Sequence, residues 1–383
     1  MYNIKTLNKI SNIGMDRFND NYKWGDDIEN PDAIMLRSFN MHDMDIPKTV
    51  RAIARAGAGV NNIPLDKCSE AGIAVFNTPG ANANAVKELV IAGILLSSRK
   101  IVESISWAST LADEGDNIGK VVEKGKSQFV GPEIMGKKLG VIGLGAIGVL
   151  VCNSACALGM DVIGYDPYIS VDAAWSLSRA VHKASSLKEI FEQCDYITIH
   201  VPLNDSTRDT INAEAIAEMK DGVRILNFAR GELVNSQAIL SAIESGKVAK
   251  YVTDFPSADM INKENVIAIP HLGASTPESE DNCAVMAADE LIDFLENGNI
   301  VNSVNLPKCV MERSTDVRIC IVHRNIPNMI SQISKYFADK HVNIENMINK
   351  SRGEYAYTIV DVDHEMNEAD IEFEGLLSVR VIK

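Results

Sequence analysis

The sequence has no long apolar run, no closely paired cysteines and no excess of basic residues, and each absence excludes a class of protein. No stretch approaches the roughly 18 apolar residues that a membrane-spanning helix needs. The seven cysteines are scattered without a CxxC pair, so we expect neither a disulfide framework nor a metal site. The net charge of -15 argues against nucleic acid as a partner, because binding to phosphates requires a basic surface.

The composition is that of a globular protein, with 46% apolar and 23% charged residues. A chain of 383 residues is too long for one compact core, so we expect two or three domains. The N-terminal stretch MYNIKTLNKISN lacks the apolar centre of a signal peptide. We therefore expect a cytoplasmic protein without a membrane partner.

Short β-branched runs alternate with helix-length segments over most of the chain, which is typical of βαβ units and parallel sheets. Helices are predicted over 84–111 and 277–297. The early strands are predicted at 33–38, 49–57 and 72–80. A second series is predicted at 139–143, 161–165, 196–200, 223–228, 249–254 and 266–269. The predicted fold class is α/β, with two doubly wound parallel-sheet domains of the Rossmann or flavodoxin-like kind.

The last part of the chain has a different order of predicted strands and helices. The segment NGNIVNSVNLPKCVMERST has the composition of a linker. Residues 316–383 then read as a strand, a helix, two strands, a short helical stretch and a final strand. This βαββαβ order predicts a small α+β unit of the ferredoxin-like kind.

A glycine-rich turn predicts a dinucleotide site. The strand KLGVI leads into Gly143-Leu-Gly145-Ala-Ile-Gly148, and an apolar helix follows. Such glycines make the tight turn, allow a pyrophosphate to approach and let the helix pack on the strand. The next strand ends in Asp166, eighteen residues after Gly148. Its carboxylate can accept hydrogen bonds from ribose hydroxyls and repel a 2′-phosphate, so we expect NAD rather than NADP.

Polar residues follow the later strands of the same series. These strands end in Val201-Pro202, in Phe228-Ala229-Arg230, in Asp254 and in His271. In a parallel sheet these ends share the edge at which ligands bind. Arg230 and His271 are therefore candidates to meet at a nicotinamide, although a surface ion pair and a core histidine are the simpler interpretations.

Several motifs in this order resemble those of the D-2-hydroxyacid dehydrogenases: the glycine loop with Asp166, MKDGVRILNFARGELVN (219–235) and PHLGAST. The segments RAGAGVNNI (55–63) and NTPGANANAVKEL (77–89) resemble the phosphoglycerate-oxidising branch of that family most closely. The resemblance begins near residue 30 and covers most of the chain. It implies an NAD-dependent oxidoreductase that takes a phosphorylated 2-hydroxy acid.

The resemblance also implies roles for individual residues. His271 would exchange the hydroxyl proton, since histidine titrates near neutrality. Arg230 would hold the substrate carboxylate with its planar, permanently charged fork. The residues expected to contact the cofactor are Gly143, Gly145, Ala146, Ile147, Gly148, Asp166, Val201, Pro202, Phe228, Ala229, Arg230, Asp254, His271 and Gly273.

One position departs from the family pattern. The family places a glutamate after a phenylalanine to orient the histidine, but here Phe255-Pro256-Ser257 leads to Ala258. We expect Asp259 to replace that glutamate, with Asp254 and Glu264 as alternatives. The resemblance assigns Asp254 instead to the nicotinamide amide.

The first domain offers cations for a phosphorylated substrate. Arg37 and Arg55 end successive predicted strands, and the resemblance places Arg55, Gly57 and Asn77 near the substrate. Two other functions stay open. The substrate is an unphosphorylated 2-hydroxy acid in the first, and the protein only senses NAD without catalysis in the second.

The C-terminal unit, with VHRNIPNMI and HVNIENM, resembles the ACT regulatory domain of that branch. ACT domains pair edge to edge, and we expect a homodimer or homotetramer. The resemblance implies L-serine as an effector, held by His323, Asn325 and Asn343, although a purely oligomerising role is the alternative. Asn328 stands where the family has glycine.

The resemblance also implies the domain boundaries. A discontinuous substrate-binding domain would comprise 1–98 and 277–306, and an NAD-binding domain 99–276. A linker would follow over 307–315, before the ACT domain over 316–383.

Overall fold

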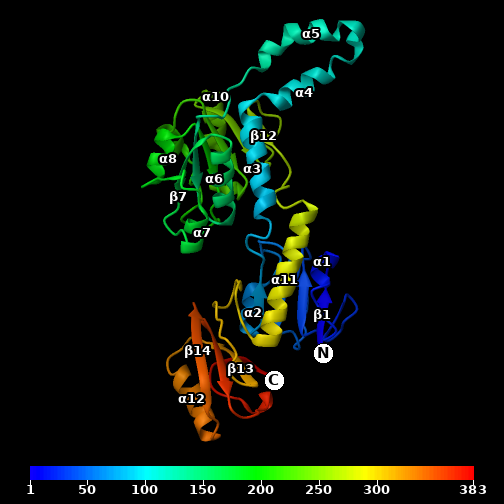
Figure 1. The fold of residues 1–383 in the computed structure, drawn as a ribbon, viewed down its shortest axis with the longest axis vertical. Coiled ribbons are helices and arrows are strands. Elements are labelled where there is room, and N and C mark those ends of the chain that lie inside the picture. The colour runs from blue at the N-terminus through cyan, green and yellow to red at the C-terminus, as the bar shows by residue number, and fades with distance from the viewer. The chain divides into compact units, whose positions relative to one another are not determined.

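The computed structural model describes residues 1–383, which form two compact units (Figure 1). One unit is Ala83–Thr276, and the other combines Met1–Asn82 with Pro277–Lys383. No helix in either unit is both long enough and apolar enough to cross a membrane.

The unit Ala83–Thr276 is built on a seven-stranded sheet in the order β12-β11-β10-β9-β6-β7-β8. All six strand pairs are parallel, as the alternating pattern predicted. The strands are β6 (Lys138–Ile142), β7 (Asp161–Tyr165), β8 (His182–Lys183), β9 (Tyr196–Ile199), β10 (Val223–Asn227), β11 (Val248–Thr253) and β12 (Val266–Ala268).

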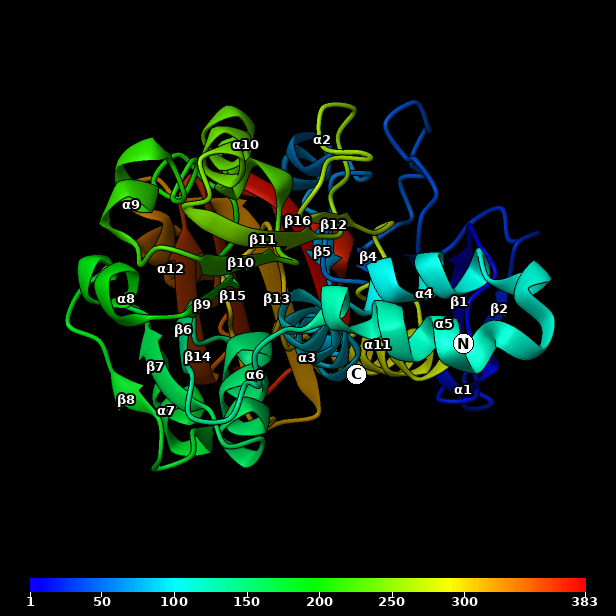
Figure 2. The ribbon, with the colours of Figure 1, turned by 90° about the horizontal axis from the view of Figure 1, so that it is seen from above.

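Helices cover both faces of this sheet (Figure 2). Two helices share one apolar cluster with the sheet, α3 (Ala83–Ser98) and α6 (Ala146–Ala157). Three others share the second cluster, α8 (Leu187–Gln193), α9 (Ala213–Glu218) and α10 (Ser236–Glu244). The short elements α7 (Val171–Ser176) and η3 (Gly231–Leu233) complete the unit. A sheet buried on both faces explains why its strands are almost continuously apolar.

Helix α3 was assigned to the substrate-binding domain by the expected boundary at residue 98. In the structure it packs on α6 and β10, and the unit boundary lies before Ala83. The difference is physical, because the buried residues Val86, Val90 and Ile94 complete the core of this sheet.

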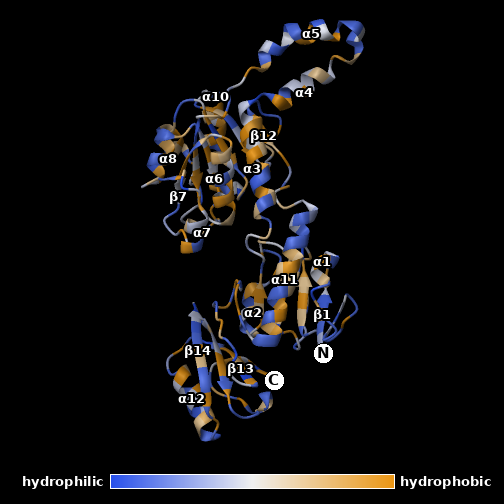
Figure 3. Cartoon of the chain, in the orientation of Figure 1, coloured by the Kyte–Doolittle hydropathy of each residue, from blue (hydrophilic) through white to orange (hydrophobic).

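A helical arm follows α3 and carries no buried helical residue (Figure 1). It consists of α4 (Ile101–Ser109), η1 (Ala112–Asn117), α5 (Ile118–Gly125) and η2 (Lys126–Phe129). Hydrophilic and hydrophobic residues are mixed along the arm, in contrast to the sheet strands (Figure 3). The buried ammonium of Lys250 in β11 pairs with Glu103 at the start of α4. The rings of Trp107 and Phe129 lie 5.2 Å apart and join the two sides of the arm.

The other unit begins with a five-stranded parallel sheet in the order β2-β1-β3-β4-β5. Its strands are β1 (Tyr2–Thr6), β2 (Tyr22–Gly25), β3 (Ala33–Leu36), β4 (Ala52–Arg55) and β5 (Ala74–Phe76). Its helices are α1 (Asn12–Met15), α2 (Leu65–Glu70) and α11 (Pro277–Asn297). Helix α11 approaches α1 closely, since a Cβ on Gly14 would lie 2.4 Å from Ala284 Cβ.

Residues 317–382 form the expected ferredoxin-like unit, with the antiparallel order β14-β15-β13-β16. The elements are β13 (Val317–Arg324), α12 (Met329–Asp339), β14 (Ile344–Arg352), β15 (Tyr355–Val362), η4 (Glu368–Asp370) and β16 (Leu376–Ile382). The predicted second helix is only the short turn η4. One sheet face packs on α12, while Cys320, Tyr357 and Ile382 on the other face join the core of α11 and the first sheet.

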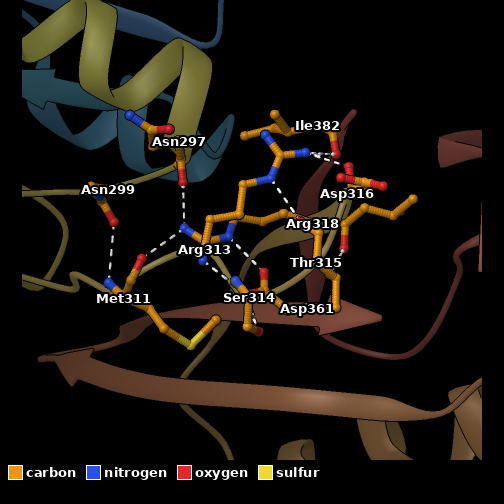
Figure 4. A network of polar contacts seen from close by, with 12 residues as sticks. Asn297, Asn299, Met311, Arg313, Ser314, Thr315, Asp316, Arg318, Asp361 and Ile382 are labelled. Carbon is orange, nitrogen blue, oxygen red and sulfur yellow. Dashed lines mark hydrogen bonds and ion pairs between the residues drawn. The ribbon is translucent and has the colours of Figure 1, made fainter. Parts of the chain in front are cut away.

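A buried polar network fixes this junction (Figure 4). The fully buried Arg318 donates to both carboxylate oxygens of Asp361 over 2.7 and 2.9 Å. It also donates to the carbonyls of Asn297 and Met311, each over 2.8 Å. The hydroxyl of Tyr357 donates to Gly298 O over 2.8 Å. The carbonyls at the end of α11 are therefore satisfied by side chains of the C-terminal domain.

The expected linker over 307–315 is part of this packing. Cys309 and Met311 are buried in the shared core, and Cys309 bridges Ile300 through two backbone hydrogen bonds. The apolar residues of this segment thus fill space between the two sheets of the unit. Its composition did not predict this packing.

Candidate active site

The strand register aligns the carboxyl ends of the seven-stranded sheet. Ile142 at the end of β6 pairs with Tyr165 and Ile199, the last residues of β7 and β9. Thr253 at the end of β11 likewise pairs with Asn227 of β10 and Ala268 of β12. The segments that follow β6, β7, β9, β10, β11 and β12 therefore lie along one edge of the sheet, as predicted.

The glycine loop at this edge has the geometry that phosphate binding requires. Gly143 has φ +93°, and a Cβ there would lie 2.5 Å from His200 O. A Cβ on Gly148 would lie 1.9 Å from Gly143 O, so the start of α6 packs directly on the turn. Around Gly145, at the helix N-cap, a Cβ would meet no atom within 4 Å. The open side and the unpaired N–H groups of α6 fit a pyrophosphate.

Asp166 supports this loop from the end of β7. Its Oδ2 accepts a hydrogen bond from Leu144 N and its Oδ1 one from Tyr168 N, each over 2.8 Å. A carboxylate has further acceptor positions, so both oxygens can still receive ribose hydroxyls. The side chain of Val201 lies against the Gly143 turn, next to the predicted contact residue Pro202.

His200 lies under the same loop. Burial lowers the pKa of its imidazole to about 4, so the ring is neutral at physiological pH. Its Nε2 pairs with Thr198 Oγ1 over 2.9 Å. We therefore interpret His200 as a structural residue.

Arg230 is exposed at the same edge, three residues beyond β10. Its Nη1 donates to Ala229 O over 2.6 Å. The buried Asn227 donates to Arg230 O over 2.8 Å and accepts from Ala229 N. Asn227 thus shapes the loop that presents the guanidinium. Its role was not predicted, although a polar residue at the end of an apolar strand is a signal that could have indicated it.

His271 is exposed three residues beyond β12, and its ring lies 4.9 Å from that of Phe255. Phe255 in turn lies next to Gly231, the residue after Arg230. The loops that carry the two predicted catalytic side chains therefore meet at Phe255. Burial raises the pKa of the neighbouring Asp254, and the positive charges of His271 and Arg230 oppose that increase.

Asp259, the predicted partner of His271, has a different contact. It is exposed, and its Oδ1 accepts a hydrogen bond from Ser257 Oγ over 2.5 Å. It makes no hydrogen bond or ion pair with His271. The turn after Pro256 directs this carboxylate to its own loop.

The geometry of this edge can be compared with known proteins. Residues 93–273 match the family described as D-isomer specific 2-hydroxyacid dehydrogenase, NAD binding domain. These residues make up most of the unit Ala83–Thr276. The glycine loop, Asp166, Arg230 and His271 all lie within the matched residues.

Two curated relatives are D-3-phosphoglycerate dehydrogenases. That of Methanocaldococcus jannaschii is 36% identical over 295 residues, covering 75% of this chain and 54% of the relative. That of Bacillus subtilis is 32% identical over 323 residues, covering 81% and 58%. The chain spans little more than half the length of these relatives. Among solved structures, NAD⁺-bound 3-phosphoglycerate dehydrogenase from Entamoeba histolytica matches with a TM-score of 0.61 at 26% identity, covering 79% of this chain and 98% of that one.

The predicted substrate residues other than Arg230 lie outside the NAD-binding domain, at the carboxyl edge of the five-stranded sheet. Leu36 and Arg55 pair at the ends of β3 and β4, so Arg37 and Arg55 lie side by side. Arg55 Nε donates to Arg37 O over 2.8 Å, and Arg37 forms an exposed ion pair with Glu280 at 2.6 Å. Asn77 Nδ2 donates to Ala58 O over 2.5 Å, next to Gly57. These four residues form one cluster.

The predicted effector residues do not form one cluster within the chain. His323 is buried, and its ring nitrogens are bonded to Thr358 Oγ1, Asn349 Oδ1 and Arg324 O. Asn325 and Asn343 are exposed. Asn325 follows β13 and Asn343 precedes β14, and these strands run in the same direction. The two asparagines therefore lie at opposite ends of the sheet.

Proposed function

We propose that the protein is an NAD-dependent dehydrogenase that oxidises 3-phospho-D-glycerate to 3-phosphohydroxypyruvate, the first step of L-serine synthesis. The observation that carries this proposal is that Arg230 and His271 follow β10 and β12, on either side of β11, at the edge that also bears the glycine loop, and that Phe255 lies against both of their loops. The names of the relatives support the choice of substrate.

The residues divide the reaction between them. Arg230 binds the substrate carboxylate through paired hydrogen bonds and polarises the neighbouring oxygen. His271 accepts the hydroxyl proton as the C2 hydrogen leaves with its electron pair. NAD held by the glycine loop and Asp166 would supply the acceptor for that hydride, and the substrate would leave as the oxo acid. In the reverse direction the protonated His271 returns its proton to the oxygen.

Arg37 and Arg55 support a phosphorylated substrate, because they add positive charge to a chain with a net charge of -15. The test is NADH formation from 3-phosphoglycerate and from unphosphorylated D-glycerate. Arg55→Ala should raise KM for the phosphorylated acid about tenfold and leave that of D-glycerate unchanged. Arg17→Ala, which removes an exposed arginine paired with Asp289, is the control.

Each alternative function has a distinct outcome. Equal turnover of both acids would indicate an unphosphorylated 2-hydroxy acid as the substrate. Binding of NAD without any turnover would indicate a sensor.

We further propose a homodimer or homotetramer. The helical arm supports it, because Ile105 and Val130 are 61% and 74% exposed and nothing in the chain covers them. Apolar surface of this kind is typical of subunit contacts. Light scattering of the native protein and of Ile105→Asp measures the association, and a monomeric native protein would contradict it.

The serine effector rests on the same assembly. Paired C-terminal domains would place Asn325 of one copy near Asn343 of the other. Titration of initial rates with L-serine should show inhibition that Asn343→Ala removes. Unchanged rates would leave the domain an oligomerising role. A cytoplasmic location stays a prediction from the sequence.

A further inference from the structure

We propose that Asn8 is a positioning residue that fixes the loop after β3 and, through it, both arginines predicted to bind the phosphate of the substrate. The inference deepens the proposed function and rests on it, because it takes Arg37 and Arg55 as the groups that receive a phosphorylated acid. All of the residues that carry it lie in the unit that combines Met1–Asn82 with Pro277–Lys383.

Asn8 lies beside this loop because the pairing of β1 with β3 continues past the ends of the strands. Thr6, at the end of β1, pairs with Met35, and Leu7 N then donates to Met35 O over 3.1 Å. Paired parallel strands advance together, residue by residue. Asn8 therefore comes level with Arg37, the first residue after β3.

A single oxygen of Asn8 receives three consecutive backbone donors of the loop. Its Oδ1 accepts from Arg37 N, Ser38 N and Phe39 N over 3.1, 3.0 and 2.8 Å. An amide oxygen has two lone pairs, so three donors use its full capacity. Residues 37–40 are exposed, whereas Asn8 is half-buried. Without this acceptor the three N–H groups would bond to water, which does not fix a backbone conformation.

A second asparagine holds the carbonyl groups of the same loop. Asn62 Nδ2 donates to Phe39 O over 2.8 Å and to Arg37 O over 3.3 Å. The carbonyl of Asn62 in turn accepts from Met41 N over 2.9 Å. The loop is thus held between two side-chain amides, since Asn8 accepts from its N–H groups and Asn62 donates to its carbonyls.

The backbone that these amides hold also orients both cations. Arg37 belongs to the loop itself. Arg55 Nε donates to Arg37 O over 2.8 Å, and its Nη1 donates to Gly59 O. Because Arg37 O orients the guanidinium of Arg55, a displacement of the loop would displace both guanidinium groups. Asn8 therefore acts on the predicted phosphate site without being one of its cations.

The neutral charge of the Asn8 amide suits an anionic substrate. The carboxylate of Asn8→Asp would accept the same three hydrogen bonds, and more strongly, because N–H donors favour an ionised acceptor. It would also place a negative charge beside the arginines that attract the phosphate, in a chain whose net charge is already -15. Asparagine thus fixes the loop without opposing the substrate.

Amide hydrogen exchange in the full-length protein, without cofactor or substrate, tests the position of the loop. Asn8→Ala should speed the exchange of the Ser38 and Phe39 amides by about tenfold or more, because both lose their acceptor. Asn8→Asp should leave them protected. The matched control is Asn19→Ala, which removes one exposed hydrogen bond from Asn21 N and should not change the loop. Unchanged exchange in Asn8→Ala would overturn the proposal.

Kinetics separate a positioning role from a merely structural one. In Asn8→Ala, KM for 3-phosphoglycerate should rise about five- to tenfold, while kcat and the KM for D-glycerate stay within about twofold of the native values. Asn8→Asp should raise the same KM, and this increase should shrink at high ionic strength because it comes from charge. Equal changes in KM for both acids, or none, would leave Asn8 a structural residue and contradict the proposal.

Failure of the proposed function gives a different result. If neither acid is oxidised, the substrate assignment is wrong, and inorganic phosphate replaces the substrate as the probe. Its binding is followed by NMR at the Nε–H signal of Arg55. Asn19→Ala should bind phosphate like the native protein, and Asn8→Ala should bind it at least about fivefold more weakly. Equal binding to all three proteins, or none to any of them, would refute the assignment of Asn8.

Discussion

Two buried aspartates show how burial alone does not define the role of a carboxylate. Asp361, at the junction with the C-terminal domain, receives four hydrogen bonds, two from Arg318 and two from Ser314. These partners hold the pKa of Asp361 below its ordinary value in spite of its burial. Asp254, at the sheet edge, has no such partner, and burial raises its pKa.

The difference separates structure from function. A carboxylate whose hydrogen-bond acceptor positions are all occupied stabilises the fold, but it cannot accept a further hydrogen bond from a reactant. A carboxylate that is buried without partners weakens the fold, but it acts strongly on any cation that approaches. The structure therefore predicts that Asp361 governs stability and that Asp254 governs reactivity.

The largest effect is expected at the filled site. Asp361→Asn leaves the guanidinium of Arg318 buried without its counter-ion, which should lower the free energy of unfolding by about 3–5 kcal/mol at neutral pH. Denaturation by urea measures it. Asp289→Asn, which breaks an exposed ion pair with Arg17 in the same unit, should cost at most about 1 kcal/mol. Equal losses in both variants would refute the distinction.

The pair of Asp361 and Arg318 also predicts how the free energy of unfolding changes at acidic pH. Because the folded pKa of Asp361 is lowered, its stabilisation is present above the unfolded value of about 4 and is lost as the pH falls below it. The native protein should therefore lose stability there faster than Asp361→Asn does.

A third carboxyl provides an intermediate case. Glu290 in α11 accepts from Asn302 Nδ2 over 2.6 Å at one oxygen, while the other is buried without a partner. Burial raises the pKa of Glu290 from 4.5 to about 8. Its contribution is thus most favourable below pH 4.5 and is lost as the pH rises toward 8. Glu290→Gln should remove this loss, and we expect a gain over the native protein of about 2 kcal/mol at pH 8. Thermal denaturation of both proteins at pH 4.5 and at pH 8 measures this gain. The same difference in stability between the two proteins at both pH values would contradict the prediction.

Substitution of Asp254, which lacks a side-chain hydrogen bond, should change the kinetics of the reaction. Asp254→Asn should lower kcat/KM for reduction of the oxo acid by about 10- to 100-fold at neutral pH, since the ionised carboxyl no longer acts on the positive charges of Arg230 and His271. The loss should shrink as the pH falls, and stability should not decrease. A pH-independent loss, or a loss of stability like that of Asp361→Asn, would assign Asp254 a structural role.

The smallest effect concerns an exposed carboxylate. Glu280 pairs with Arg37 at the edge of the five-stranded sheet, where both side chains are more than 40% exposed. Exposed pairs are worth at most about 1 kcal/mol, so Glu280→Gln should lower KM for 3-phosphoglycerate about two- to fivefold by releasing Arg37. An unchanged KM would remove Arg37 from phosphate recognition.

Some of these features were predictable from short segments. The glycine loop, Asp166 and the strand ends at Arg230 and His271 depend on local chain geometry and on the rule that parallel strands share one edge. The strands β1 and β2 were not predicted, because Tyr2–Thr6 and Tyr22–Gly25 mix polar and apolar residues without a clear alternation. The helix α12 and the strands around it were predicted, because their periodicity is strong.

The direction of the Asp259 side chain could not be predicted in the same way. A one-residue offset from the family motif made Asp259 the natural choice as the partner of His271, and sequence spacing carries no information about the direction in which a loop side chain points. The packing of the C-terminal domain was equally hidden. Whether Cys320 and Tyr357 face α11 or solvent depends on which sheet face is covered, and both faces are apolar.

Local order in the chain was therefore enough to establish the parallel sheets, the nucleotide loop and the side chains at the strand ends, because these follow from backbone geometry over a few residues. The contact that Asp259 makes with Ser257, the unit to which α3 belongs and the burial of residues 307–315 were decided only in three dimensions. Each depends on contacts between segments distant in sequence, where burial and charge are properties of the assembled structure rather than of any one residue.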